Sequence, residues 1–187
     1  HVRFWDNGDH AIVPLSGRPG FALPTDRPDT LLVGMGKEVG TVDVTTGAFT
    51  PLATIPDADP RTIINDGEVV PGGGAVVFGT KDTKFADPIA HLYLFTVADR
   101  RVSVLADKQL CSNGKVFAGD VLHDIDTPQK VVTRYRFDAT GRSVRPEAVA
   151  VDLKAHPAFP DGMCDVGDGT VIVAFFDPAE RPHGRAG

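Results

Sequence analysis

Residues 131–141 read VVTRYRFDATG, and this stretch indicates the fold more clearly than any other part of the chain. Val131, Thr133, Tyr135 and Phe137 alternate with Val132, Arg134 and Arg136, so the two sets lie on opposite faces of an extended segment. Such alternation is typical of an antiparallel strand with one buried face. The Asp-Ala-Thr-Gly that follows is typical of a turn, so the stretch predicts a strand that runs into a tight turn.

The same strand-and-turn pattern occurs at three other places in the chain. It is found at Val42–Gly47, at Phe95–Arg100 and in the shorter Trp5–Gly8. The turns fall at positions 8, 47, 100 and 141, which are 39, 53 and 41 residues apart. These intervals are close to the roughly 40 to 50 residues of one blade of a β-propeller. The spacing therefore predicts an all-β propeller with about four blades in this chain, and an irregular β-sandwich is the alternative.

Other short runs rich in β-branched residues lie between clusters of Gly, Pro and Asp, and none has helical periodicity. The chain contains 20 Gly and 15 Pro in 187 residues, which also favours short strands joined by turns. The predicted strands are Thr30–Val33, Val39–Val44, Gly74–Gly79, His91–Val97, Val102–Ala106, Val131–Phe137, Ala148–Leu153 and Thr170–Phe176.

The charge balance excludes several classes of partner. The chain has 19 Lys and Arg against 25 Asp and Glu, a net charge of −6, so it offers no basic surface for nucleic acid or an anionic membrane. The longest apolar run, Val171–Phe176, is far shorter than the roughly 20 residues that span a bilayer. No signal peptide precedes the first strand, and we expect a cytoplasmic protein.

Three short polar motifs are the candidate functional residues. They are Asn65-Asp66-Gly67, Asn113-Gly114 and Asp161-Gly162, and each is typical of a turn. Asn65, Asn113 and Asp161 are separated by 48 residues each, so a propeller would place them at equivalent positions of successive blades. They would then converge on the central channel. Amide and carboxylate oxygens suit Ca²⁺, Mg²⁺ or Mn²⁺ better than a zinc site rich in cysteine.

Several linked motifs together resemble the family of six-bladed propellers that includes regucalcin, gluconolactonase and the luciferin-regenerating enzyme. The motifs cover most of the chain and follow the family's order and spacing. They are Asn65-Asp66-Gly67, Phe78-Gly79-Thr80, His91-Leu92-Tyr93-Leu94, Ser112-Asn113-Gly114, Asp124-Ile125-Asp126-Thr127-Pro128, Arg134-Tyr135-Arg136-Phe137-Asp138 and Pro160-Asp161-Gly162-Met163-Cys164.

The resemblance implies one divalent cation (Ca²⁺, Zn²⁺, Mn²⁺ or Mg²⁺) in the channel. Its ligands would be Asn113, Asp161 and a glutamate of the first blade that has no counterpart here and would lie upstream of His1. We therefore expect residues 1–187 to be a single-domain, partial propeller that lacks most of the first blade and the last blades. The resemblance also implies that Asn65 assists the substrate or a metal-bound water.

The resemblance further implies the hydrolysis of a small-molecule sugar lactone. The cation would polarise the lactone carbonyl and activate water, and Asp161 or Asp126 would accept the proton. His123 and Asp126 are candidates for substrate binding, and the alternative for His123 is a surface group. A phosphotriesterase-like hydrolase and a non-catalytic calcium-binding propeller are the alternative functions.

The sequence departs from the family pattern at one substrate-contacting position, and it has two cysteines. The family often has a substrate-contacting arginine two residues before the first Asn, and this position is Ile63, while Arg61 is out of register. Cys111 and Cys164 each lie within three residues of a proposed ligand. We expect both to be small buried residues that pack under turns, rather than a thiol pair or a disulfide at the channel.

Overall fold

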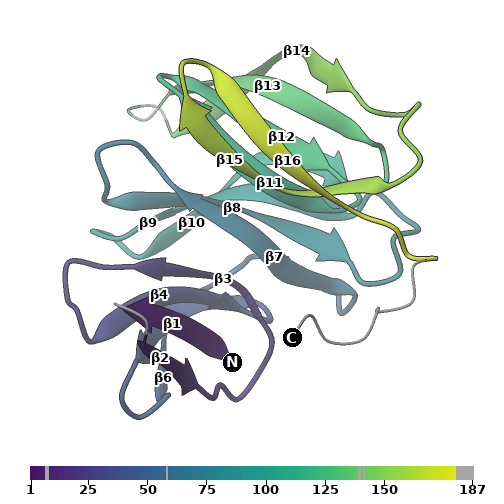
Figure 1. The fold of residues 1–187 in the computed structure, drawn as a ribbon. Coiled ribbons are helices and arrows are strands. Elements are labelled where there is room, and N and C mark those ends of the chain that lie inside the picture. Colours follow the sequence, from purple (N-terminus) through teal and green to yellow (C-terminus); the bar gives the residue numbers. More distant parts are fainter. Residues whose placement is uncertain (7–8, 58, 139, 141, 180–187) are drawn as a thin grey trace.

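The protein is described here by a computed structural model that covers residues 1–6, 9–57, 59–138, 140 and 142–179. All regular elements in these ranges are antiparallel strands, arranged in five sheets (Figure 1). The first sheet holds β1 (Val2–Asp6) and β2 (Asp9–Val13). The second holds β3 (Pro19–Pro24), β4 (Thr30–Met35), β5 (Glu38–Asp43) and β6 (Phe49–Thr54). The third holds β7 (Thr62–Val69), β8 (Ala75–Asp82), β9 (Ala90–Thr96) and β10 (Arg101–Gln109). The fourth holds β11 (Ser112–Ala118), β12 (Val121–Asp126), β13 (Val131–Asp138) and β14 (Ser143–Asp152), and the fifth β15 (Phe159–Gly167) and β16 (Thr170–Phe176).

The sheets follow one another as the blades of a propeller, which confirms the predicted fold class. Within each four-stranded sheet the strands lie side by side in chain order. The first strand of each blade contacts the first strand of the next, so that β3 lies against β7, β7 against β11 and β11 against β15. Three complete four-stranded blades thus stand between two sheets of two strands each (Figure 1).

Two of the four predicted turns lie among the described residues and join the third and fourth strands of their blades. Gly47 lies between β5 and β6 and has a φ of 72°, and Arg100 lies between β9 and β10 with a φ of 53°. Gly8 and Gly141, the other two predicted turn positions, lie outside the described residues. The predicted runs that begin at Thr30, Val39, Gly74, His91, Val102, Val131, Ala148 and Thr170 all fall on observed strands.

The interpretation of the three polar motifs as turns is wrong. Asn65-Asp66-Gly67 lies inside β7, Asn113-Gly114 inside β11 and Asp161-Gly162 inside β15. At each motif the pairing register shifts, which is the mark of a β-bulge. At the second motif glycine serves close packing: a Cβ on Gly114 would lie 2.7 Å from the carbonyl oxygen of Asp161 on the next inner strand.

The core consists of apolar layers between neighbouring blades. Strand β8 shows why, because Val76 and Phe78 pack toward the second sheet whereas Val77 packs toward the fourth. Strand β4 behaves in the same way, with Leu32 on one side and Val33 on the other. Both faces of an inner-blade strand are therefore buried, and these strands appear in the sequence as continuous apolar runs.

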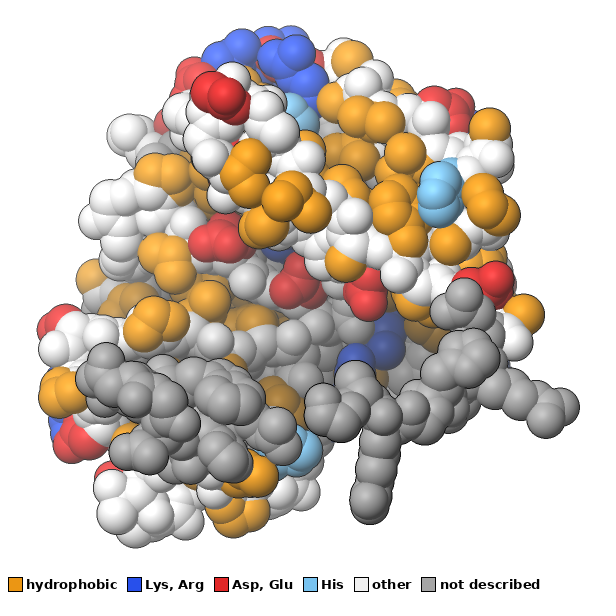
Figure 2. Space-filling view, viewed as in Figure 1, with side chains coloured by type: hydrophobic (Ala, Val, Ile, Leu, Met, Phe, Trp, Pro, Cys, Tyr) orange, Lys and Arg blue, Asp and Glu red, His pale blue; other side chains and the backbone are white. Residues whose placement is uncertain are grey.

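The last two sheets carry the most exposed apolar surface. Hydrophobic side chains gather over this part of the molecule (Figure 2). They include Val149 and Val151 on β14 and Ile172, Phe175 and Phe176 on β16, each more than a third exposed. Among the described residues there is no helix with the length and apolar character needed to cross a membrane.

Candidate functional site

The inner strands bring together the residues that the 48-residue spacing singled out. Asn65 lies on β7, Asn113 on β11 and Asp161 on β15, each beside the bulge of its strand. A bulge turns a side chain away from the regular alternation of the strand. Strand β11 lies between β7 and β15, so Asn113 can contact a residue on either neighbouring inner strand.

Asn113 and Asp161 are in direct contact between the fourth and fifth sheets. The Asn113 amide nitrogen donates a hydrogen bond to the Asp161 carboxylate. The same nitrogen lies 3.2 Å from the hydroxyl oxygen of Thr127, and Asn113 is 9% exposed, while Asp161 is exposed. Thr127 is thus a site residue to which the sequence analysis assigned no role, although it lies in the Asp126-Thr127-Pro128 motif.

Asn65 joins the third blade to the fourth. Its amide nitrogen donates to the carbonyl oxygen of Ser112 at 3.1 Å and lies 3.5 Å from the sulfur of Cys111. Asn65 is 8% exposed. Its amide oxygen makes no hydrogen bond within the described chain, so it remains available as an acceptor.

Asp126 is committed to the backbone of the preceding loop. Its carboxylate accepts hydrogen bonds from the amide of Leu110 (3.1 Å), the amide of Cys111 (3.2 Å) and the side chain of Gln129 (2.7 Å). Burial raises the pKa of Asp126, and these hydrogen bonds act against that rise. Asp126 lies close to Asn113 in the fold, but its carboxylate oxygens already accept hydrogen bonds.

A buried ion pair lies directly behind these groups, and the sequence analysis did not find it. The ammonium group of Lys115 lies 3.2 Å from the Asp124 carboxylate, and neither side chain has any exposed surface. Asp124 also accepts hydrogen bonds from Ser112 (2.8 Å) and Gln109 (2.5 Å). Lys115 donates to the carbonyl oxygen of Asn113 at 3.1 Å, so the pair supports the strand that carries Asn113.

The ion pair also reaches the neighbouring blade. The Lys115 nitrogen lies 3.9 Å from the carboxylate of Asp66, the residue that follows Asn65. Burial raises the pKa of Asp124, whereas Lys115 and the hydrogen bonds from Ser112 and Gln109 lower it. Lys115 therefore stands between two carboxylates from different blades.

His123 is not part of this group. It pairs with Val116 in the ladder, three residues along β11 from Asn113 and toward the opposite end of the strand. It lines a cavity of about 490 Å³ between the fourth and fifth sheets together with Met163 and Asp165. Burial and the charge of Arg134 lower its pKa.

The neighbourhood of Ile63 contains a cation from another strand. Arg61 does not serve there, because its guanidinium lies 2.7 Å from Asp87 and 3.6 Å from Asp59. Ile63 pairs in the ladder with Lys81 of β8, and Lys81 forms a bridge with Cys111 at the start of the next blade.

The expectation for the two cysteines is half confirmed. Cys111 is buried, and burial raises its pKa to about 12. Cys164 is exposed, so the prediction that it is buried is wrong, because the fifth sheet leaves that face of β15 uncovered. The two thiols form no disulfide.

The donor set at Asn113 and Asp161 fits a hard divalent cation in part. Both side chains carry an oxygen of the kind that Ca²⁺, Mg²⁺ and Mn²⁺ prefer. The contact between them is made by the Asn113 nitrogen, while the Asn113 oxygen accepts a hydrogen bond from the Gly114 amide at 3.2 Å. Within the described residues, no three His, Cys, Asp or Glu side chains come close enough to hold a metal by themselves. A cation bound here would therefore need further oxygen ligands.

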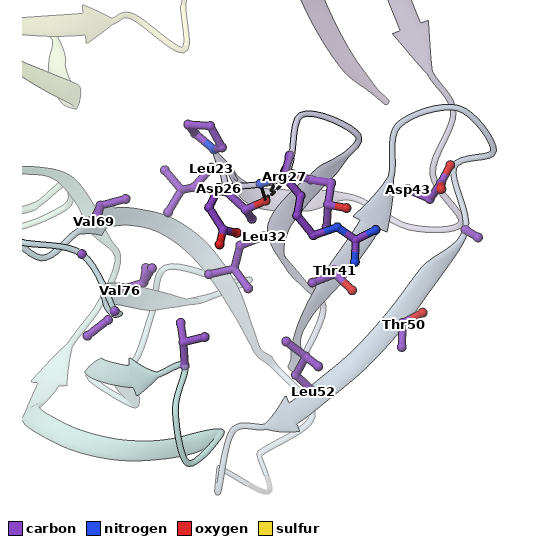
Figure 3. Close-up of a pocket in the computed structure, with 18 residues that line it drawn as sticks. Leu23, Asp26, Arg27, Leu32, Thr41, Asp43, Thr50, Leu52, Val69 and Val76 are labelled. Carbon is purple, nitrogen blue, oxygen red and sulfur yellow. Dashed lines mark hydrogen bonds between the residues drawn. The ribbon is translucent and has the colours of Figure 1, made fainter.

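A larger cavity lies away from this group. It measures about 690 Å³ and opens between the second and third sheets. Figure 3 shows Leu23, Leu32 and the turn residue Asp26 on one side of it, with Val69 and Val76 on the other. None of its lining residues belongs to the candidate site.

The series of four-stranded antiparallel blades defines a propeller of the kind found in the lactonase and regucalcin class. Residues 1–181 match the model of the family described as the SMP-30/gluconolactonase/LRE-like region. The chain belongs to this family, which confirms the resemblance noted in the sequence.

Individual relatives agree with this membership. The chain is 38% identical over 85 residues to L-arabinolactonase from Azospirillum brasilense, a match that covers 46% of this chain and 28% of that protein. The chain spans less than half of the length of the curated relatives that it matches.

Solved structures share the fold. A luciferin-regenerating enzyme superposes with a TM-score of 0.80 at 20% identity, covering 90% of this chain and 59% of that one. Regucalcin from Agrobacterium tumefaciens, described as a calcium-binding protein, superposes with a TM-score of 0.73 at 22% identity, covering 83% and 52%.

Proposed function

We propose that the protein hydrolyses a sugar lactone and that Asn113 and Asp161 bind the divalent cation that this reaction uses. The family contains lactonases, and a relative at 38% identity is an arabinolactonase. The observation that carries the proposal is the contact between the Asn113 amide and the Asp161 carboxylate, which joins two adjacent inner strands beside Asn65.

The residues of the site take distinct roles in this proposal. When bound, a divalent cation supplies polarisation of the lactone carbonyl and a lower pKa for water. Asp161 is exposed and accepts the proton from the attacking water. Thr127 orients the amide of Asn113, and the free amide oxygen of Asn65 accepts a hydrogen bond from a hydroxyl of the sugar.

The geometry favours Asp161 over Asp126 as the proton acceptor. Asp126 already accepts three hydrogen bonds from Leu110, Cys111 and Gln129, and it is 4% exposed. A base must reach the water whose proton it takes, and Asp161 has the accessible carboxylate. In the same way Asn65 is favoured over His123 for substrate binding, because His123 lies toward the other end of its blade.

We further propose that residues 1–187 form a single domain that contributes part of a six-bladed ring. The superposition includes 90% of this chain but 59% of the luciferin-regenerating enzyme. The additional oxygen ligands that the cation requires would come from other parts of that ring.

The test combines metal binding with hydrolysis. The full-length protein, Asp161→Ala and Asp165→Ala are titrated with Ca²⁺, Mn²⁺ and Zn²⁺ by calorimetry and assayed with gluconolactone and a phosphotriester. Asp165 is the matched control, because it is an exposed carboxylate on the same strand and, among the described residues, accepts a hydrogen bond from the Gly167 amide alone.

Loss of metal binding and of gluconolactone hydrolysis together in Asp161→Ala, with both retained in Asp165→Ala, would support the proposal. Metal binding without hydrolysis would point to a non-catalytic calcium-binding propeller. Hydrolysis of the phosphotriester alone would point to a phosphotriesterase-like hydrolase. Absence of metal binding by the unaltered protein would overturn the cation site.

A further inference from the structure

Lys81 forms β-pairs with two residues that are each close to Asn65, the residue that we assign to substrate binding. It pairs directly with Ile63 of β7, and Ile63 is two residues from Asn65. Lys81 also bridges to Cys111, whose sulfur is 3.5 Å from the Asn65 amide nitrogen. Directly paired residues of an antiparallel ladder present their side chains on the same face. Lys81 therefore shares a face with Ile63, beside the candidate site.

The ammonium group of Lys81 has no ion-pair partner among the described residues. Within the part of the chain that the structure describes, it makes neither an ion pair nor a hydrogen bond. The ring of Phe85, in the loop that follows β8, lies 5.4 Å from the ammonium nitrogen. In a chain of net charge −6, in which carboxylates outnumber cations, an unpaired lysine at a polar site stands out.

One cationic and one anionic side chain, Arg18 and Asp161, act on the charge of Lys81. Burial lowers the pKa of Lys81, and the nearby guanidinium of Arg18 lowers it further, while Cys111 and Asp161 act in the opposite direction. A second cation and the proposed base are thus close enough to Lys81 to influence it. Among the described residues the Lys81 ammonium contacts an aromatic ring but pairs with no anionic group, and an anionic ligand would supply a charged partner.

We propose that Lys81 is a specificity-determining residue that binds an anionic substituent, a carboxylate or a phosphate, on the lactone substrate. This inference rests on the proposed lactonase function. The lactone ring lies over Asn113 and Asp161, and its anionic substituent extends to Lys81, with Arg18 adding positive charge. Ile63 carries no charge, so the positive charge at this place comes from the paired strand.

The test compares neutral and anionic lactones of similar size. Steady-state hydrolysis is followed by acid release with D-glucono-1,5-lactone, which is neutral, with D-glucaro-1,4-lactone, which carries a carboxylate, and with 6-phospho-D-glucono-1,5-lactone. The full-length protein is compared with Lys81→Met, Lys81→Arg and Lys84→Met. Lys84 is the matched control, because it is an exposed lysine in the adjacent loop.

The unaltered protein is expected to prefer one of the anionic lactones, and the preferred one identifies the group as carboxylate or phosphate. Lys81→Met should lower kcat/KM for that lactone about tenfold to a hundredfold, mainly through KM, as expected for the loss of a charge-assisted hydrogen bond. Hydrolysis of the neutral lactone should change less than about twofold. Lys81→Arg should keep most of the preference, and Lys84→Met should change neither rate.

The outcomes separate this inference from the function on which it rests. Hydrolysis of the neutral lactone without preference for an anionic one would overturn the role of Lys81 and leave the lactonase function standing. Equal losses for both kinds of lactone in Lys81→Met would do the same. If no lactone is hydrolysed, the proposed function and the inference both fail.

Discussion

Lys115 and Asp124 form an ion pair with a nitrogen-to-oxygen distance of 3.2 Å at a place where neither side chain has exposed surface. The pair joins β11 to β12 immediately behind the strand segment that carries Asn113. Removing one partner of a buried pair leaves an uncompensated charge, which is far more damaging than removing both.

We therefore expect Lys115→Met to lower the free energy of unfolding by about 3–5 kcal/mol, measured by urea denaturation. The double variant Lys115→Met/Asp124→Leu should recover much of that loss. Lys154→Met is the control, because Lys154 is exposed and pairs with the exposed Asp152, so a change below about 1 kcal/mol is expected. A loss below about 1 kcal/mol in Lys115→Met would contradict the importance of the pair.

Gly114 allows β11 and β15 to approach closely. A Cβ at this position would lie 2.7 Å from the Asp161 carbonyl oxygen and 2.8 Å from the Cβ of Met163. Gly114→Ala should therefore destabilise the fold by about 1–3 kcal/mol and displace Asp161 from Asn113. Gly162→Ala is the matched control, since a Cβ on Gly162 has no neighbour within 4 Å. Equal stability of the two variants in thermal denaturation would contradict this account.

Thr127 holds the amide of Asn113 through its hydroxyl group, at 3.2 Å. Thr127→Val keeps the shape and removes the hydroxyl, so we expect it to weaken divalent-cation binding about tenfold, in the range typical for the loss of a residue that orients a ligand. Thr127→Ser retains the hydroxyl and should bind within about threefold of the unaltered protein. Calorimetric titration of all three proteins decides the matter, and identical affinities for valine and serine would argue against an orienting role.

Asp82 should make the protein sensitive to acid. Backbone amides of Asp87 and Lys84, with that of Ala86, lower its pKa to about 2. A carboxyl group whose pKa is lower in the folded state stabilises the fold above its unfolded value of about 3.9. That contribution is lost as the pH falls from about 4 to about 2.

The corresponding experiment is denaturation of Asp82→Asn as a function of pH. The unaltered protein should lose more stability between pH 5 and pH 2 than the variant does, since the variant lacks the titrating group. Asp107→Asn, at an exposed position, serves as the control and should follow the unaltered protein. Parallel curves for all three proteins would show that Asp82 does not carry the acid sensitivity.

The two cysteines should react at different rates with a thiol reagent. Cys111 is 3% exposed, and burial raises its pKa to about 12, so little thiolate is available at neutral pH. Cys164 is exposed. We expect one equivalent of rapid reaction in the native protein and two after denaturation, and loss of the rapid phase in Cys164→Ser.

Much of the fold could be predicted because its origins are local. The alternation of Val131–Phe137 and the turns at Gly47 and Arg100 follow from residue type and spacing over a few positions. The three polar motifs were misassigned as turns for the same reason, because Asn-Gly and Asp-Gly favour turns in isolation. Only pairing with the second strand of the same blade, β8, β12 or β16, makes these segments part of β7, β11 and β15.

The candidate site, too, could be predicted only in those features that follow from local sequence. The sequence by itself determined that the chain is all-β, that its blades repeat, and that Asn65, Asn113 and Asp161 recur every 48 residues. Each of these properties follows from the types of residue and their spacing along the chain. Only the tertiary structure decided that Asn113 touches Asp161, that Lys115 is buried against Asp124, and that Lys81 stands opposite Ile63. These relationships depend on bulges and on packing between blades, and both arise from contacts between residues that are distant in the chain.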